Sequence, residues 1–151
     1  GVAEIMVSFA LSDDFSKIYS YCGLLHDLGK YSEGFQRYIS FGGEKEPHAK
    51  WGAYMAKNNK LINIALPIYG HHAGLPNRDA MDEALGICNQ EKGKWEIILQ
   101  AIKDDEANTS PCDNDAFNKI SGTLRKELFI RMLYSSLVDA DSLDTERHFQ
   151  L

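Results

Sequence analysis

His26-Asp27-Leu28-Gly29-Lys30 places an imidazole and a carboxylate on adjacent residues. One nitrogen ligand beside one oxygen ligand suits a divalent cation such as Mn²⁺, Fe²⁺, Ni²⁺ or Co²⁺. A single His-Asp pair is more often a helix-surface feature or a hydrogen-bonded couple than a metal site. The residues around this pair favour the metal interpretation.

The residues that precede the pair predict a helix that delivers His26 to the protein interior. Apolar side chains recur there at steps of three and four residues, at Phe15, Ile18, Tyr19, Cys22 and Leu25. His26 follows Cys22 by four residues and continues the same stripe, so its ring needs a partner in the interior. Gly29 is expected to end this helix, and Lys30 would place a cation beside the site for an anionic substrate.

Composition predicts one globular domain over residues 1–151. The chain is 44% hydrophobic and 25% charged, and it is long enough to bury a core. It contains no apolar run of membrane-spanning length and no signal-peptide pattern, so we expect no membrane partner and a cytoplasmic location. Three cysteines without Cys-x-x-Cys spacing argue against a disulfide framework and a structural zinc site.

The net charge of −6 argues against a protein that holds nucleic acid by a broad basic surface. Two bound divalent cations would add about four positive charges at one place. The sign of the charge at the site can therefore differ from that of the whole chain.

Three further histidines are candidate ligands. His48 follows the Gly-rich loop 41–47 at the start of a predicted helix, where a capping or surface role is the ordinary alternative. His71 and His72 lie between glycines directly after the apolar segment 61–69. A glycine-flanked turn can direct both rings toward one point, which favours a joint role.

The last long helix is predicted over residues 121–143, and it supplies the final candidate. One of its faces is apolar over Ile130, Leu133, Tyr134, Leu137 and Ala140. Asp141 lies at the margin of that face, where a carboxylate is costly unless it meets a cation. Asp139 points nearly the opposite way and is the reserve candidate.

Other segments complete an all-α prediction. Helices are expected over residues 1–11, over 32–39 with Phe35, Tyr38 and Ile39 facing inward, over 48–55 and over 95–102. Residues 91–94 are expected to form a turn, and residues 104–115 a solvated loop. We expect the charged residues after Leu143 to lie on the surface.

Four motifs follow one another at residues 23–31, 48–53, 70–76 and 137–146. They read Gly-Leu-Leu-His-Asp-Leu-Gly-Lys-Tyr, His-Ala-Lys-Trp-Gly-Ala, Gly-His-His-Ala-Gly-Leu-Pro and Leu-Val-Asp-Ala-Asp-Ser-Leu-Asp-Thr-Glu. In this order they resemble the HD superfamily of metal-dependent phosphohydrolases. More narrowly, they resemble the HD nuclease of type I CRISPR systems, a domain that is usually joined to a helicase of the DEAD-like class.

The resemblance implies an all-α helical bundle with a two-metal centre that cuts single-stranded DNA in CRISPR antiviral defence. It implies a helicase domain in cis or in trans and a CRISPR surveillance complex as partners. His26 and Asp27 would be central ligands, with Asp27 bridging the two metals. Asp141 would complete the first site, and Lys30 would contact phosphate. The second metal would be bound by His48, His71 and His72.

The chain departs from the family pattern at one point. The family carries another metal-binding histidine just ahead of a Val-Ala-Glu-like segment, whereas Val2-Ala3-Glu4 opens this chain with no histidine before it. Either the fragment begins a few residues late, or one metal site is incomplete.

The expected chemistry is hydrolysis by a water activated by two metal ions about 3.5–4 Å apart, with no side-chain nucleophile. Imidazole ligands favour Mn²⁺, Ni²⁺, Co²⁺ or Fe²⁺, with Mg²⁺ as a further option. Two alternatives remain open. One is a phosphohydrolase acting on nucleotides or cyclic dinucleotides, and the other is a catalytically incomplete metal-binding domain. Endonuclease and exonuclease activity are both compatible with the sequence.

Overall fold

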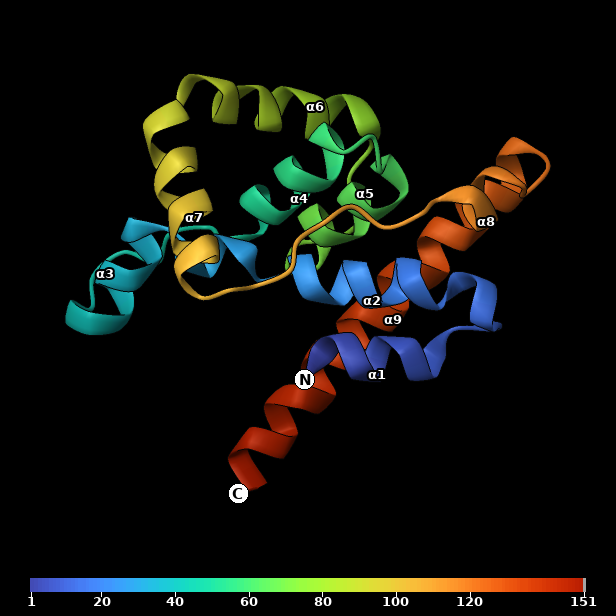
Figure 1. The fold of residues 1–151 in the computed structure, drawn as a ribbon, viewed down its shortest axis with the longest axis horizontal. Coiled ribbons are helices and arrows are strands. Elements are labelled where there is room, and N and C mark those ends of the chain that lie inside the picture. The colour runs from blue at the N-terminus through green and yellow to red at the C-terminus, as the bar shows by residue number, and fades with distance from the viewer. Residues whose placement is uncertain (151) are drawn as a thin grey trace.

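The computed structural model describes residues 1–150, and every regular element within them is a helix. The all-α prediction is therefore confirmed (Figure 1). The α-helices and 3₁₀ helices, in order, are α1 (Val2–Phe9), η1 (Asp13–Phe15), α2 (Ser16–Leu25), η2 (Leu28–Tyr31), α3 (Glu33–Phe41), α4 (Ala49–Asn58), α5 (Ile62–Gly70), α6 (Arg78–Gly86), η3 (Ile87–Gln90), α7 (Lys92–Asp104), α8 (Asp115–Asn118) and α9 (Thr123–Gln150).

Helix α2 occupies the centre of the bundle. It contacts α1, α4, α5 and α9, while α4 and α5 pack against each other and α9 crosses both α1 and α5 (Figure 1). The core at these crossings is formed by side chains that are almost completely buried: Ile18, Cys22, Leu25, Trp51, Ile64, Ile68, Leu133 and Leu137. The helix that leads to the His-Asp pair is thus surrounded by packed neighbours, which hold its C-terminal end in place.

A glycine allows α4 to pack closely on α2. A Cβ atom at Gly52 would lie 2.0 Å from the carbonyl oxygen of Leu25, so a larger residue would push the two helices apart. This contact occurs one residue before His26. The small residue in α4 therefore helps to position the end of α2 from which the pair emerges.

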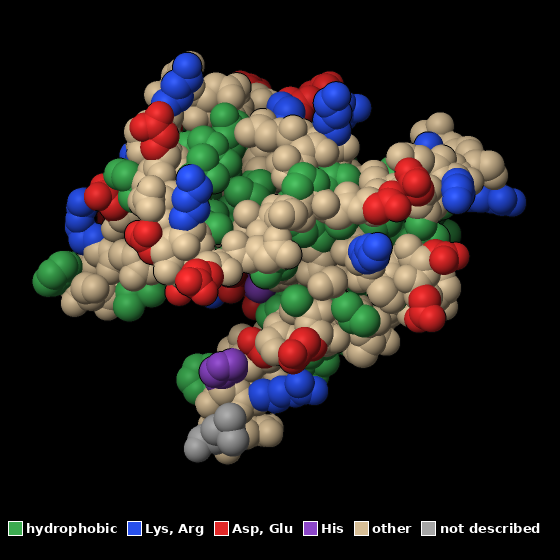
Figure 2. Space-filling model, viewed as in Figure 1, with side chains coloured by type: hydrophobic (Ala, Val, Ile, Leu, Met, Phe, Trp, Pro, Cys, Tyr) green, Lys and Arg blue, Asp and Glu red, His purple; other side chains and the backbone are tan. Residues whose placement is uncertain are grey.

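Helices α3, α6 and α7 lie at the periphery (Figure 1). Figure 2 shows Lys, Arg, Asp and Glu side chains interspersed over one face of the molecule, with hydrophobic side chains gathered between α4 and α7. Trp51 of α4 and Trp95 of α7 stack with ring centroids 5.7 Å apart. None of the helices within residues 1–150 combines the length and apolarity needed to cross a membrane.

Three expected boundaries were wrong. Helix α2 ends at Leu25 rather than Gly29, because the backbone changes to a turn at His26-Asp27 and then to η2. Residues 92–94 belong to α7 rather than to a turn, and Lys94 pairs there with Glu91 at 3.3 Å. Helix α9 continues to Gln150, since the charged residues after Leu143 include no helix breaker, and its end projects from the body (Figure 1).

Helix α3 differs from expectation in the face that it buries. Ser32 caps the helix by accepting a hydrogen bond from the Phe35 backbone amide, and Phe35 is buried as predicted. Ile39, however, is 62% exposed, because α3 contacts the body mainly at η2 and its last turn extends beyond that contact. The prediction of an inward-facing Ile39 was wrong.

Candidate metal centre

The structure brings together six candidate ligands from four distant segments. His26 and Asp27 occupy the turn between α2 and η2, and His48 is the N-cap residue of α4. His71 and His72 directly follow α5, and Asp141 lies within α9. Asp139, the reserve candidate, is exposed on another face of α9 and is absent from these clusters.

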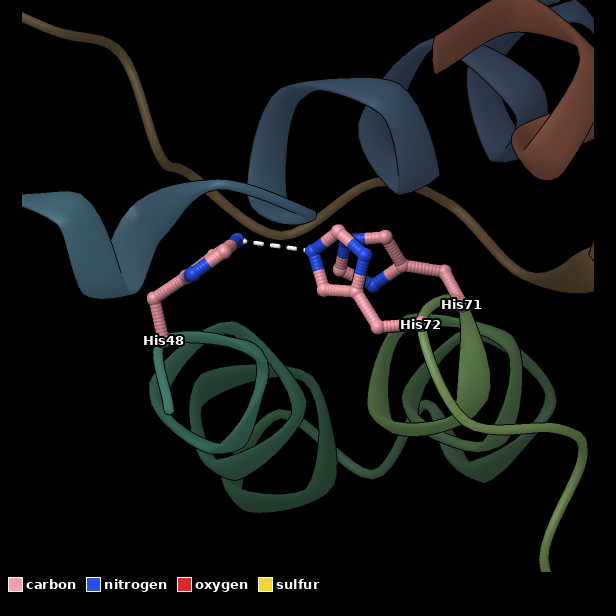
Figure 3. Close-up of side chains that lie close together, drawn as sticks. All are labelled: His48, His71 and His72. Atoms are coloured by element: carbon pink, nitrogen blue, oxygen red, sulfur yellow. Dashed lines mark hydrogen bonds between the residues drawn. The ribbon is translucent and has the colours of Figure 1, made fainter. Parts of the chain in front are cut away.

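The six residues form two groups of three. His26, Asp27 and Asp141 make up the first group, and His48, His71 and His72 make up the second. Within each group the possible ligand atoms all lie within 4.8 Å of one another. Figure 3 shows the three rings of the second group directed at one space between the start of α4 and the end of α5.

Asp27 lies between the two groups. Its Oδ2 atom is 3.1 Å from His26 Nε2, and its Oδ1 atom is 3.3 Å from His48 Nε2. Asp141 approaches His26 from the other side, with Oδ1 at 3.5 Å from Nε2. One carboxylate therefore presents one oxygen to each group, which is the arrangement that a bridging ligand needs.

Backbone carbonyls fix the orientation of two rings. His26 Nδ1 donates to the Gly23 carbonyl and His71 Nδ1 donates to the Ile68 carbonyl, both at 2.6 Å. Because a carbonyl only accepts, the Nδ1 atom of each ring carries a hydrogen, and Nε2 faces the site. The Nε2 atoms of His26 and His71 are buried and make no well-directed hydrogen bond within residues 1–150. This is the outer-shell arrangement of metal-binding histidines.

His48 and His72 face each other through their Nε2 atoms, which are 2.9 Å apart (Figure 3). In octahedral coordination, ligand atoms about 2.1 Å from one shared ion and at right angles lie about 3 Å apart. Both this contact and the contacts of Asp27 are close to that spacing. The residues present therefore fit a divalent metal ion, and the exposed ring of His72 gives the second group access to solvent.

The electrostatics of the first group follow from its contacts. Burial by itself would lower the pKa of His26, but contacts with Asp141 and Asp27 raise that pKa to about 9. Burial would raise the pKa of Asp27, yet His26, His48 and Lys30 hold it well below its usual range. The pKa of Asp141 is lowered by contact with His26. Both carboxylates are thus ionised at neutral pH, and a cation bound at His26 would displace a proton.

In the second group, two histidines have lowered pKa values, in contrast to His26. Burial lowers the pKa of His71 to about 4, and burial together with the nearby His48 lowers the pKa of His72. The rings of His71 and His72 are therefore neutral at pH 7. Neutral imidazole is the form that binds a metal ion.

Comparison with protein-family models matches the HD domain over residues 1–109, which is 109 of the 151 residues. The chain belongs to the HD domain family. Comparison with curated proteins and comparison with solved structures gave no match. Family membership assigns this HD domain to the metal-dependent phosphohydrolases, and its His and Asp groups could hold the metal. Asp141 lies beyond the matched range.

Gly29 has a different role in this HD domain from the one expected. A Cβ atom at Gly29 would lie 1.8 Å from the carbonyl oxygen of His48. The glycine therefore permits the backbone of η2 to contact the start of α4, which brings His48 to Asp27. The interpretation of Gly29 as a helix stop was wrong, because α2 has already ended at Leu25.

Lys30 lies at the mouth of the HD site. Its Nζ atom donates to Asp27 Oδ2 at 2.5 Å, and 45% of its side chain is exposed. The contact places the ammonium group beside the first ligand group. The role of Lys30 toward phosphate stays a prediction.

Sequence reasoning missed a groove that continues from the second ligand group. It has a volume of about 490 Å³, and His48 and His72 are among the residues that line it. Its other walls come from the loop before α4, from α6 and from η3, at Lys45, Ala84 and Ile87. No periodicity connects these segments, so the only signal in the sequence was the nearness of Lys45 and Lys50 to His48.

Proposed function

We propose that this HD domain is a metal-dependent nuclease that cleaves single-stranded DNA in CRISPR antiviral defence. The observation that carries the proposal is the position of Asp27, whose two oxygens face the two ligand groups at 3.1 and 3.3 Å. Paired cations held by a shared carboxylate are typical of phosphodiester hydrolysis. The order of the four motifs supports the narrower assignment to the type I CRISPR nucleases.

Each ligand group would hold one ion, with Asp27 shared between them. When bound, two such ions supply an activated water and offset the charge on the leaving oxygen. The second group consists of imidazoles, which suits Mn²⁺, Ni²⁺, Co²⁺ or Fe²⁺ better than Mg²⁺.

The side chains around the site would supply its charge, hold the rings in place and contact the phosphate. Asp27 and Asp141 stay ionised and give the site its negative charge, while the carbonyls of Gly23 and Ile68 hold the rings of His26 and His71 in one orientation. Lys30 is exposed enough to leave Asp27 for a nonbridging phosphate oxygen, where it would stabilise the charge that accumulates during attack.

Two observations favour a polymer over a mononucleotide as the substrate. His72 is exposed, and Asp27 and Asp141 keep 28% and 30% of their side-chain surface, so the centre opens to solvent. The adjoining groove is also open rather than enclosed. A chain that continues in both directions can enter such a site, whereas a single nucleotide usually requires a pocket that surrounds it.

The proposal includes partners. The net charge of −6 gives little attraction for DNA over the surface as a whole. We therefore propose that a helicase module, in cis or in trans, and a CRISPR surveillance complex deliver the single strand to the site.

The test is nicking of circular single-stranded DNA in the presence of Mn²⁺, which also detects endonuclease activity because the substrate has no ends. His26→Ala and Asp27→Ala should abolish nicking, whereas Asp139→Ala should cut like the wild type because its side chain lies on another face of α9. Unchanged nicking in His26→Ala would overturn the proposal. A parallel panel of nucleotides and cyclic dinucleotides separates the alternative phosphohydrolase, which would hydrolyse those compounds and leave DNA intact.

A further inference from the structure

The groove beside the second ligand group has the composition of a nucleotide site. Its lining is mostly apolar, with residues such as Tyr69, Ala84 and Ile87, and it includes two lysines, Lys45 and Lys50. Ile87 is 55% exposed although it is a large aliphatic residue. An apolar surface bordered by cations suits a ligand with a flat apolar part and a negative charge.

The groove is continuous with the metal centre, because His48 and His72 belong both to its wall and to the second ligand group. If a ligand's phosphate binds at that group, the remainder of the ligand would lie in or beside the groove. The volume of about 490 Å³ lies within the range of small-molecule sites and far exceeds the space that a phosphate requires.

The two lysines have different environments. Lys50 is held by Glu91, with Nζ 3.7 Å from Oε2, and it lies over the Trp51 ring at 5.2 Å from the centroid. Lys45 makes no ion pair within residues 1–150 and belongs to the loop between α3 and α4. Lys45 is therefore the cation free to contact an incoming anion, and Lys50 contributes a fixed positive charge.

We infer that this groove seats the nucleotide that flanks the scissile phosphate of single-stranded DNA, with its base against Ile87 and Tyr69 and its next phosphate at Lys45. The inference rests on the proposed nuclease function and assigns the residues that bind the strand. Base contact with an apolar or aromatic wall tolerates any sequence, because every base has a flat face. The groove therefore gives affinity for the strand without selecting a base sequence.

The test uses Ile87→Glu, which places a carboxylate in the groove, and Lys45→Glu, which reverses the free cation. Ile39→Glu and Lys119→Glu are matched controls, since both are exposed positions that do not line the groove. In the presence of Mn²⁺, Ile87→Glu should raise the KM for a single-stranded oligonucleotide about tenfold, the scale of one lost base contact. Lys45→Glu should also raise the KM, because the reversed charge repels the phosphate. Bound manganese, measured by mass spectrometry, should equal that of the wild type.

A second test measures binding and does not depend on DNA cleavage. The Mn²⁺-loaded protein is titrated calorimetrically with dAMP and with inorganic phosphate, and the two affinities are compared. The wild type should bind dAMP more tightly than phosphate, and Ile87→Glu should bind the two equally. Equal affinities in the wild type, a KM that Ile87→Glu leaves unchanged, or loss of manganese from the groove variants would each overturn the inference. Failure of the proposed function would instead be seen as a wild type that leaves DNA uncut.

Discussion

Asp27 Oδ1 lies 3.3 Å from His48 Nε2, across a contact that joins the His-Asp turn to the start of α4. The other oxygen of the same carboxylate faces His26. Asp27 belongs to the first ligand group and also contacts a member of the second, so it is the candidate to serve both.

Asp27→Asn should therefore remove metal from both groups. The neutral amide binds a cation more weakly than the carboxylate that the two groups would share. Asp141→Asn should reduce the metal content by one ion, and Asp139→Asn should leave it unchanged. Metal bound per chain after dialysis against Mn²⁺ checks this order. An Asp27→Asn protein that retains the wild-type stoichiometry would contradict the bridging position.

Gly29→Ala should destabilise the protein and displace His48. The added methyl group would meet the His48 carbonyl oxygen, and overpacking of this kind costs about 1–3 kcal/mol. Gly86→Ala is the matched control, because a Cβ there meets nothing within 4 Å and Ala is the better helix residue. Urea unfolding of the two variants should show a loss of stability for Gly29→Ala and a small gain for Gly86→Ala.

Divalent metal should stabilise the folded chain, since the ligand groups exist only when distant segments pack together. At a free Mn²⁺ concentration a hundred times the Kd, binding contributes about 2.7 kcal/mol per site. For a chain of this size that corresponds to a rise in Tm of about 5–10 °C. Thermal unfolding with Mn²⁺ and with a chelator measures it, and His148→Ala, at an exposed position outside both groups, should respond like the wild type. An identical Tm under the two conditions would support an inert domain.

Acid should weaken the metal-free protein through His71. The folded pKa of this residue is about 4, because burial disfavours its charged form, whereas the unfolded ring titrates near pH 6.5. The unfolded chain therefore binds more protons between these values, so stability falls as the pH decreases from about 6.5 toward 4, by up to about 3 kcal/mol. Urea unfolding in chelator at several pH values should show a shallower dependence for His71→Gln. Equal slopes would contradict the prediction.

Several features of the fold and site were accessible from the sequence because they follow from periodicity. The stripe through Cys22 and Leu25 predicts the burial of His26, which is confirmed at 4% exposure. The helical wheel of α9 places Asp141 beside the buried stripe and Asp139 away from it. In the structure Asp141 contacts His26, and Asp139 is exposed. Periodicity works here because both residues lie on or beside regular helices.

Other features depend on contacts between segments, which no local pattern encodes. The approach of Gly29 to His48 requires η2 and α4 to meet, and the facing Nε2 atoms of His48 and His72 require the start of α4 to lie beside the end of α5, as in an antiparallel pair. The groove combines three separate segments for the same reason. The position of Asp27 between two groups became visible only when all four segments were assembled.

The span between His26 and Asp141 has a consequence for biosynthesis. The first ligand group closes across 115 residues of chain, and its last member arrives with α9. Until the ribosome has added α9, the emerging polypeptide contains His26 and Asp27 but not Asp141. A newly made chain thus gains its complete first ligand group only once α9 has been synthesised, after the helices that shield the site.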